Sequence, residues 1–339
     1  MADALLPQDL VEQLGDPAAF ERWSALTGDG VLVLDLRGRA GGLTVSPAAE
    51  RLTQLPAVSV AWVEDEVEPG LRPLAAAVDV LVQDPASFAL LRSVVSRTPL
   101  AALALVQLLR HSEGRSIHDG LTAESWVYGM LQAGPEFATW LAAREPRAIE
   151  SSREPAVRIT RDGDRLELVL NRPERRNAFS AAMRDGLCEG LALVHQDPTI
   201  RSVELRGAGP SFSSGGDLDE FGSLPDPATA HAVRSTRNPG RLLAEVAGRV
   251  HAYVHGACVG AGVELPAFCT RVTARPDAFF LLPEIEMGLV PGAGGTVSLP
   301  RRIGRQRTAW LALSGERLSA ESALAWGLVD EVADIGTPR

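Results

Sequence analysis

Two glutamates, each beside a cluster of glycines, are the residues of this 339-residue chain best suited to chemistry. Glu264 ends the run Gly260-Ala261-Gly262-Val263-Glu264, and Glu284 precedes the run Pro291-Gly292-Ala293-Gly294-Gly295. A glycine-rich turn that opens a helix leaves main-chain N–H groups unpaired and points the positive end of the helix dipole at one place. Carboxyl groups beside such donors suit proton transfer next to an oxygen that becomes anionic.

The same glutamates and glycine clusters also have simpler, non-catalytic interpretations. A glutamate beside a glycine turn is, taken alone, more often a capping group than a catalyst. The run Gly260–Gly262 lacks the third glycine of a dinucleotide-binding motif, and Gly292–Gly295 is not followed by the Lys-Ser/Thr of a phosphate-binding loop. We expect His251 and His255 to pack rather than act as bases, and Asp217 to stabilise its own loop.

The composition is that of a globular protein, with 45% hydrophobic and 22% charged residues. A formal net charge of −10 argues against nucleic acid or an anionic membrane as the main partner. Cys188, Cys258 and Cys269 lack metal-ligand spacing and predict no disulfide framework. The sequence has no signal-peptide pattern and no apolar run of about 18 residues. We therefore expect a cytoplasmic protein.

Apolar runs and turn residues predict an α/β protein. Strands are expected at residues 31–36, 58–63, 78–82, 202–206 and 250–254. Helices are expected at 99–110, on both sides of Gly134-Pro135, and at 180–194. A hairpin is expected at 156–170 with its turn at Asp162-Gly163, and the polar stretch 219–238 is expected to be helical and mobile. The proline-punctuated segment 144–156 is interpreted as a linker between domains at 1–150 and 151–339.

Four motifs between residues 157 and 334 resemble, in order, those of the crotonase (enoyl-CoA hydratase/isomerase) superfamily. One glycine cluster is weak evidence, but four motifs with two glutamates 20 positions apart are specific. The motifs are Leu170-Asn171-Arg172-Pro173 with Arg176-Asn177-Ala178, then Ser211-Phe212-Ser213-Ser214-Gly215-Gly216-Asp217-Leu218, then Gly260–Glu264, then Pro283–Gly295. The resemblance implies a spiral of β-β-α units that binds acyl-CoA in an extended groove.

The resemblance also implies roles for residues at matching positions. The amides of Gly216 and Ala261 would form an oxyanion hole for the thioester carbonyl, although the family usually has glycine where Ala261 stands. Glu264 and Glu284 would hold one water molecule with help from the amide of Gly292, and Glu284 would be the main acid/base. Two acids this close should titrate as a pair.

Contacts with coenzyme A are implied for Arg176, Asn177, Ala178 and Ser214, with Arg176 near the phosphates. No metal is implied, and no cofactor other than the coenzyme A carried by the substrate. Family members are commonly trimers or pairs of trimers, so a homotrimer or hexamer is expected. Thr270 stands where many relatives have an acid, which points to a drift in activity.

Three kinds of function compete. The first is hydration of a 2-enoyl-CoA to a 3-hydroxyacyl-CoA. The second is double-bond isomerisation, which needs one acid, most plausibly Glu284, or another crotonase-type lyase or hydrolase reaction. The third is a non-catalytic acyl-CoA-binding or assembly protein, against which the retention of Glu264 and Glu284 argues.

The first half of the chain lacks these motifs but echoes the second half. Leu36-Arg37-Gly38 parallels Leu205-Arg206-Gly207, which suggests a degenerate, inactive crotonase-like copy. Thr98–Arg144 resembles the C-terminal helices that cover the acyl-CoA in relatives, whereas no such helices follow Val332. We therefore expect the first half to complete the pocket, in the same chain or from a neighbouring subunit.

Overall fold

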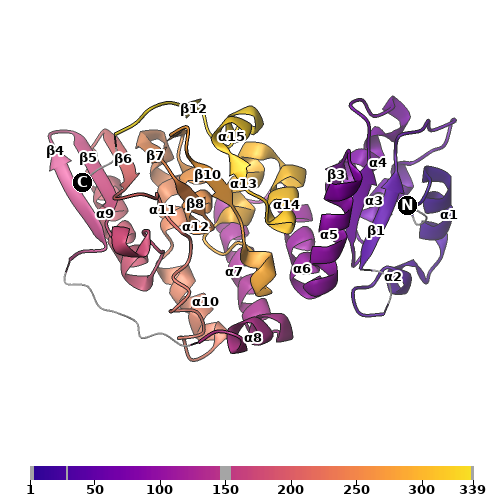
Figure 1. Ribbon diagram of the computed structural model, residues 1–339, viewed down its shortest axis with the longest axis horizontal. Helices are drawn as coiled ribbons and strands as arrows, with labels where there is room; N and C mark the ends of the chain where they lie inside the picture. The colour runs from indigo at the N-terminus through magenta and orange to yellow at the C-terminus, as the bar shows by residue number, and fades with distance from the viewer. Residues whose placement is uncertain (1–3, 28–29, 146–153, 337–339) are drawn as a thin grey trace.

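The computed structural model describes residues 4–27, 30–145 and 154–336 and contains three sheets. A small parallel sheet from the start of the chain lies at one end of the molecule, a six-stranded sheet lies at the other, and helices fill the space between them (Figure 1). This arrangement confirms the α/β class.

The N-terminal sheet has the order β1-β2-β3, with every pair parallel. Its strands are β1 (Val31–Asp35), β2 (Val58–Trp62) and β3 (Val80–Val82), as the apolar runs predict. Every residue of β2 is buried, because helices cover both faces of a parallel sheet. The helices of this part are α1 (Pro7–Gly15), α2 (Ala19–Arg22), α3 (Ser46–Leu52) and α4 (Arg72–Ala77), with a 3₁₀ turn η1 at Pro69–Leu71.

Four helices follow this sheet, and a proline stands in the first turn of three of them, where its missing N–H costs no hydrogen bond. They are α5 (Pro85–Arg97), α6 (Pro99–Arg110), α7 (Ile117–Gln132) and α8 (Pro135–Ala142). The break at Gly134-Pro135 is confirmed. No single helix within the described ranges is long and apolar enough to cross a membrane; α5 and α6 pass that test only together, and they bend by 111°.

The six-stranded sheet has the order β12-β9-β7-β6-β5-β4. Its strands are β4 (Val157–Asp162), β5 (Arg165–Leu170), β6 (Ser202–Gly207), β7 (Val250–Val254), β9 (Arg271–Ala274) and β12 (Glu331–Val332). Strands β4 and β5 form the expected hairpin, but its turn is Gly163-Asp164, one residue later than predicted, because Gly163 takes the positive φ of 58°.

The remaining elements surround a third, three-stranded sheet of order β11-β10-β8. Its strands are β8 (Ala257–Val259), β10 (Phe279–Leu281) and β11 (Leu318–Ser319). The α-helices of this half are α9 (Ala181–Gln196), α10 (Pro227–Thr236), α11 (Pro239–Val246), α12 (Ala261–Glu264), α13 (Gly295–Ile303), α14 (Arg305–Ser314) and α15 (Ala320–Trp326). The 3₁₀ turns are η2 (Pro173–Arg175), η3 (Ala247–Arg249), η4 (Pro266–Phe268) and η5 (Glu284–Met287). Of the stretch 219–238, only α10 is helical.

The hydrophobic core does not follow the order of the chain. One cluster contains only residues of the first 78 positions, between α1 and β3. The other cluster joins Leu105 on α6, Leu121 on α7 and Phe137 on α8 to the second half. Helix α7 lies beside α10 and α13 (Figure 1), as expected of helices that complete the second half. The proposed linker lies mainly at residues 146–153, outside the described ranges, and the boundary at 150 stays a prediction.

A buried ion-pair network joins the N-terminal sheet to the second half. The Asp79 carboxylate, just before β3, accepts bonds from Arg110 at 2.5 and 2.8 Å and from Arg305 of α14 at 3.2 Å. It also accepts the amide and hydroxyl of Ser59. Asp79 is 1% exposed, so its charge depends on these partners for stabilisation.

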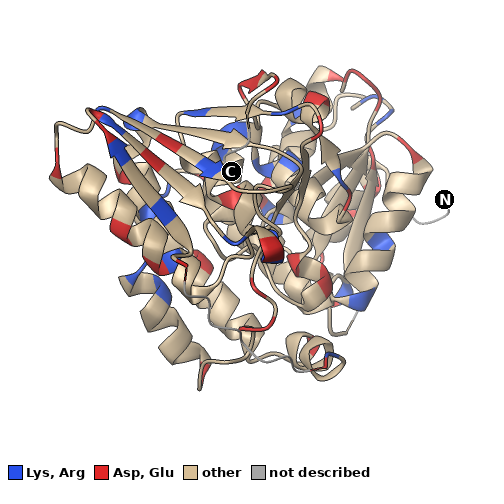
Figure 2. Cartoon of the chain, turned by 60° about the vertical axis from the view of Figure 1, so that its left-hand side comes forward, with Lys and Arg blue, Asp and Glu red and all other residues tan. Residues whose placement is uncertain are grey.

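Charged side chains on the six-stranded sheet are paired locally. Basic and acidic positions are interspersed along these strands (Figure 2). Arg206 on β6 donates to Glu204 at 2.9 Å, and Arg165 on β5 pairs with Glu204 at 2.5 Å. This face therefore carries both signs of charge in close alternation and offers no extended basic surface.

Candidate active site

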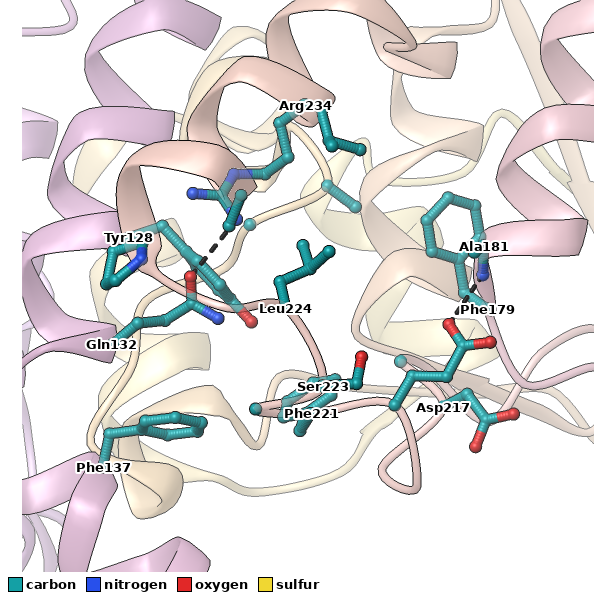
Figure 3. A pocket seen from close by; sticks show the side chains of 18 of the residues that line it. Tyr128, Gln132, Phe137, Phe179, Ala181, Asp217, Phe221, Ser223, Leu224 and Arg234 are labelled. Atoms are coloured by element: carbon teal, nitrogen blue, oxygen red, sulfur yellow. Dashed lines mark hydrogen bonds between the residues drawn. The ribbon is translucent and has the colours of Figure 1, made fainter. Parts of the chain in front are cut away.

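A cavity of about 740 Å³ lies between helices of the first half and loops of the second half. Tyr128 and Gln132 of α7 and Phe137 of α8 line one side of it (Figure 3). Phe179 and Asp217 line the opposite side, and Phe221 and Leu224 lie between the two sides. The expectation that the first half contributes to the pocket agrees with this geometry.

Glu264 lies at the end of α12 and lines this cavity while being 2% exposed. Its position depends on Gly260, which precedes the helix with a φ of +48°. The Oε2 atom of Glu264 accepts the amides of Ala293 at 2.8 Å and Gly295 at 2.7 Å. The second glycine cluster therefore binds the carboxylate that follows the first cluster.

Glu284 is the first residue of η5 and lines the same cavity. Its Oε1 lies so close to Gly260 that a Cβ there would come within 2.5 Å of it. Its Oε2 is buried and accepts no hydrogen bond from the residues that the structure describes. The fold thus brings Glu264 and Glu284 to one cavity across 20 positions of sequence.

Burial gives the two acids unusual proton affinities. Burial, together with the negative charge of Glu124, raises the pKa of Glu284 to about 8. Burial also raises the pKa of Glu264 well above its usual value, and the charges of Glu284 and Glu124 act in the same direction. The amides of Gly295 and Ala293 oppose this shift, because they stabilise the ionised form.

Gly216, in the loop after β6, and Ala261, at the start of α12, line the same cavity. No protein acceptor within residues 4–27, 30–145 and 154–336 receives either amide. Gly216 has no room for a side chain, because a Cβ there would lie 2.8 Å from the ring of Phe221. Ala261 is the first residue of α12, where the first turn leaves amides unpaired. Two main-chain donors are therefore available beside the two acids.

Gly292 also lines the cavity, in contact with the ring of Tyr128. A Cβ at Gly292 would lie 2.4 Å from that ring, so only glycine allows α7 to approach this closely. The amides that bind the carboxylate of Glu264 are those of Ala293 and Gly295. The predicted role of the Gly292 amide in holding water stays a prediction.

Sequence reasoning missed two residues of α7, Glu124 and Tyr128. Glu124 accepts the amides of Gly294 at 2.7 Å and Thr296 at 3.0 Å, and it is 2% exposed. Burial raises its pKa to about 7. The available signal was their spacing of four, which places two polar groups on the helix face that carries Leu121.

The cavity wall also combines aromatic rings with arginines, one of which is Arg234 of α10. Arg234 of α10 donates to Gln132 at 3.3 Å (Figure 3) and to Ser125 at 2.9 Å. Its guanidinium lies 4.8 Å from the centre of the Tyr128 ring. The stretch 219–238 contributes Phe221, Leu224 and Arg234 to the cavity wall.

The residues predicted to contact coenzyme A gather next to Gly216 rather than in the cavity. Arg176 is exposed and, like Asn177, has a positive φ, 52° and 54° respectively. The Asn177 side chain is buried, and its amide nitrogen donates to Ala208 and Ser211 at 2.9 Å. Its main-chain N–H donates to the carbonyl of Arg172, and its carbonyl accepts the hydroxyl of Ser213, so a ligand could contact Asn177 only at that carbonyl. Ser214 is half-buried beside Arg176, whose carbonyl accepts its amide, and Ala178 is buried.

The neighbouring polar residues have structural partners. Asp217 pairs with Arg175 at 3.0 Å. His251 contacts the Thr273 hydroxyl, and His255 Nε2 contacts the carbonyl of Gly209, both at 2.8 Å. Glu286 is exposed. Among the residues that the structure describes, no group of three or more His, Cys, Asp or Glu side chains is placed to hold a metal ion.

Comparison with known proteins identifies the family to which this α/β fold and its site belong. The family model "Enoyl-CoA hydratase/isomerase" matches residues 166–334. The chain is 40% identical over 173 residues to 1,2-epoxyphenylacetyl-CoA isomerase of Escherichia coli (strain K12), covering 50% of this chain and 66% of the relative. It is 37% identical over 181 residues to 2,3-dehydroadipyl-CoA hydratase of the same organism, covering 51% and 68%.

Solved structures give the same result. An enoyl-CoA hydratase from Thermoplasma volcanium GSS1 superposes with a TM-score of 0.50 at 36% identity, covering 54% of this chain and 73% of that one. An enoyl-CoA hydratase from Mycobacterium smegmatis superposes with a TM-score of 0.50 at 32% identity, covering 53% of this chain and 70% of that one. This chain belongs to the enoyl-CoA hydratase/isomerase family, the crotonase superfamily. It spans about two thirds or less of the length of the curated relatives that it matches most strongly.

Proposed function

We propose that this protein hydrates the double bond of a 2-enoyl-CoA to give a 3-hydroxyacyl-CoA. One observation carries the proposal: Glu264, which is buried, and Glu284, which is half-buried with a buried Oε2 atom, line one cavity. Gly216 and Ala261 line the same cavity, and their amides have no protein acceptor among the residues that the structure describes. Amides fixed in such a place stabilise an oxyanion without reorganising, and removal of one donor typically costs about 3 to 4 kcal/mol.

In the proposed reaction, the thioester carbonyl accepts the amides of Gly216 and Ala261. Ionised Glu264 takes a proton from a water molecule as the oxygen of that water bonds to C3. The electron pair of the C2–C3 double bond moves to give an enolate, whose oxygen the two amides hold. Protonated Glu284 then gives its proton to C2, and proton exchange between the two carboxyl groups restores the starting state.

The environment of the two acids supports this division of roles. Burial raises the pKa of Glu284 to about 8, so this group is mainly protonated at neutral pH and suits a proton donor. The carboxylate of Glu264 accepts two amides on one oxygen, and these donors stabilise its ionised form against the burial and the neighbouring charges that raise its pKa.

Double-bond isomerisation is the second candidate. It moves a proton between C2 and C4 and needs one acid beside the oxyanion hole. The observation that favours it is the Oε2 atom of Glu284, which is buried without a partner among the described residues, whereas Glu264 is already bound by two amides.

Mass spectrometry of product mixtures separates the two reactions. Incubation with a 2-enoyl-CoA should add the mass of one water, whereas a 3-enoyl-CoA that only isomerises keeps its mass. The rate of hydration should fall by a factor of about 10² to 10⁴ in both Glu264→Ala and Glu284→Ala. Isomerisation should tolerate Glu264→Ala better than Glu284→Ala. Absence of any mass gain with a panel of 2-enoyl-CoA thioesters would overturn the hydratase proposal.

Other parts of the proposal derive from the family. We propose that coenzyme A lies along Arg176, Ala178 and Ser214 with main-chain contact at Asn177. Support comes from their position beside Gly216, since the Gly215 carbonyl accepts the amide of Phe179, and Phe179 lines the cavity. A cytoplasmic location and a homotrimer or hexamer remain predictions.

We also propose that residues 31–82 are a degenerate copy of the second half. The order and direction of β1-β2-β3 are those of β6-β7-β9 in the large sheet. In both units a short helix leads from the second strand towards the third: α4 in the first and α12 in the second. Helix α4 of the first unit (Arg72–Ala77) contains no acidic residue.

A further inference from the structure

Four consecutive amides at the start of α13 are divided between two carboxylates. The amides of Ala293 and Gly295 donate to Oε2 of Glu264, at 2.8 and 2.7 Å. The amides of Gly294 and Thr296 donate to Glu124, at 2.7 and 3.0 Å. Alternate amides of this turn point in opposite directions, so each carboxylate fixes the orientation of the peptide groups that the other one uses.

Glu124 approaches the turn from α7, 170 positions earlier in the chain. Its Oε2 also accepts the Thr296 hydroxyl at 2.7 Å, so the three described donors occupy both of its oxygens. The helices are in close contact here, because a Cβ at Gly120 of α7 would lie 3.0 Å from Val297 of α13. This spacing keeps Glu124 within reach of the amides.

No cation neutralises Glu124 through a direct ion pair in the described part of the chain. The positive charge of Arg234 opposes the rise in the pKa of Glu124 without a direct ion pair, and its guanidinium lies over the Tyr128 ring. The other charged or titratable groups that act on Glu124 and the two acids are Glu264, Glu284 and Tyr128. Placing a third acid beside two others is electrostatically costly, and a purely structural cap would not need a carboxylate there.

We infer that Glu124 is a positioning residue for the proposed reaction: through the amides of Gly294 and Thr296 it holds the turn that fixes the carboxylate of Glu264. The first half of the chain therefore contributes to the chemistry as well as to the pocket wall. The catalytic part of this inference rests on the proposed function; the structural part does not.

The test compares Glu124→Gln with the wild-type full-length chain in two measurements. Amide hydrogen exchange, resolved to single residues by NMR, should show faster exchange at Ala293 and Gly295, which Glu124 does not touch. With crotonyl-CoA as probe, kcat should fall about tenfold to a hundredfold with little change in KM, because a misplaced acid slows the chemical step. The matched control is Asp79→Asn, another buried carboxylate in the first half, which should lower stability without changing kcat.

Thr296 provides a second, milder pair of variants should Glu124→Gln fail to fold. Thr296→Val removes one of the three donors to Glu124 and should lower kcat, and Thr296→Ser keeps the hydroxyl and should restore it. Unchanged exchange at Ala293 and Gly295 in Glu124→Gln, or in Thr296→Val if that is the variant that folds, would overturn the inference. The inference would also be overturned if the Glu124→Gln variant had the same kcat as the Asp79→Asn control. If wild-type protein does not turn over enoyl-CoA, the proposed function fails, and the exchange measurement still decides whether Glu124 positions the turn.

Discussion

The two parallel units, β1-β2-β3 and β6-β7-β9, share strand order and direction but differ in the connections between their strands. After β2 the chain enters an exposed acidic loop at 64–66 and then α4. After β7 it enters β8 and then Gly260 and α12, which place Glu264 in the cavity. Strand order alone therefore gives no chemistry. The connections at the carboxyl ends of the strands carry it.

The tripeptide Leu-Arg-Gly shows the same difference at the level of single residues. Gly207 is the last residue of β6, whereas Gly38 lies three residues beyond the end of β1. The backbone of Phe212 lies close to Gly207, and a Cβ added at Gly207 would be 2.7 Å from the carbonyl oxygen of Phe212. A Cβ added at Gly38 would have no atom within 4 Å. Equal sequence thus serves a tight loop in one unit and an open turn in the other.

Buried carboxylates show the difference in electrostatics. Asp79 in the first unit has two arginine partners, Arg110 and Arg305. Glu264 in the second unit has only main-chain donors and lies near other acids. A carboxylate paired with cations stabilises the fold in its ionised form, whereas one without cations retains the proton affinity that acid–base chemistry requires.

The largest effect should come from the paired carboxylate. Asp79→Asn leaves Arg110 and Arg305 buried without their counter-charge, and it should lower the free energy of unfolding by about 3 to 5 kcal/mol. Urea denaturation followed by circular dichroism measures this. Glu264→Gln is the contrasting variant and should cost much less, since it removes a buried charge that has no cation. Equal losses in the two variants would remove the electrostatic distinction between the units.

The glycine pair should give an intermediate effect. Gly207→Ala forces a methyl group against the backbone of Phe212 and should destabilise the protein by about 1 to 3 kcal/mol. Gly38→Ala meets open space and should change stability by less than about 0.5 kcal/mol. Thermal unfolding of the two variants side by side checks both values. A large loss for Gly38→Ala would mean that the first unit packs its loop as tightly as the second.

A third effect should be a change in how stability depends on pH. The folded-state pKa of Glu284, about 8, lies above its usual value of 4.5. Its contribution to stability is therefore fully present below pH 4.5 and is lost as the pH rises through 8. Relative to wild type, Glu284→Gln should gain stability between pH 5 and pH 8. The same titration of Asp79→Asn gives the comparison from the first unit. A constant difference between Glu284→Gln and wild type would contradict a raised pKa.

Much of the fold can be predicted from local sequence. Uninterrupted apolar runs predicted β1 and β2 within one or two residues, because burial on both faces of a sheet needs such runs. Strands β6 and β7 were also predicted within one or two residues, but buried and less buried residues alternate along them, which indicates one buried face. The break before α8 was predictable from Gly134-Pro135, since proline cannot continue a helix. The predicted position of the hairpin turn was wrong by one residue. Both Asp162-Gly163 and Gly163-Asp164 fit a two-residue turn, and the pairing of the two strands decides between them.

The sequence alone determined which residues are able to do chemistry here: two glutamates beside glycine turns, whose backbone must start helices with unpaired amides. Tertiary structure decided which groups surround them. Glu124 and Tyr128 reach the site because an apolar stripe packs α7 against α13, and such a stripe specifies burial without specifying the partner. Proton affinity was likewise decided by the fold, because desolvation and neighbouring charge exist only once distant segments meet.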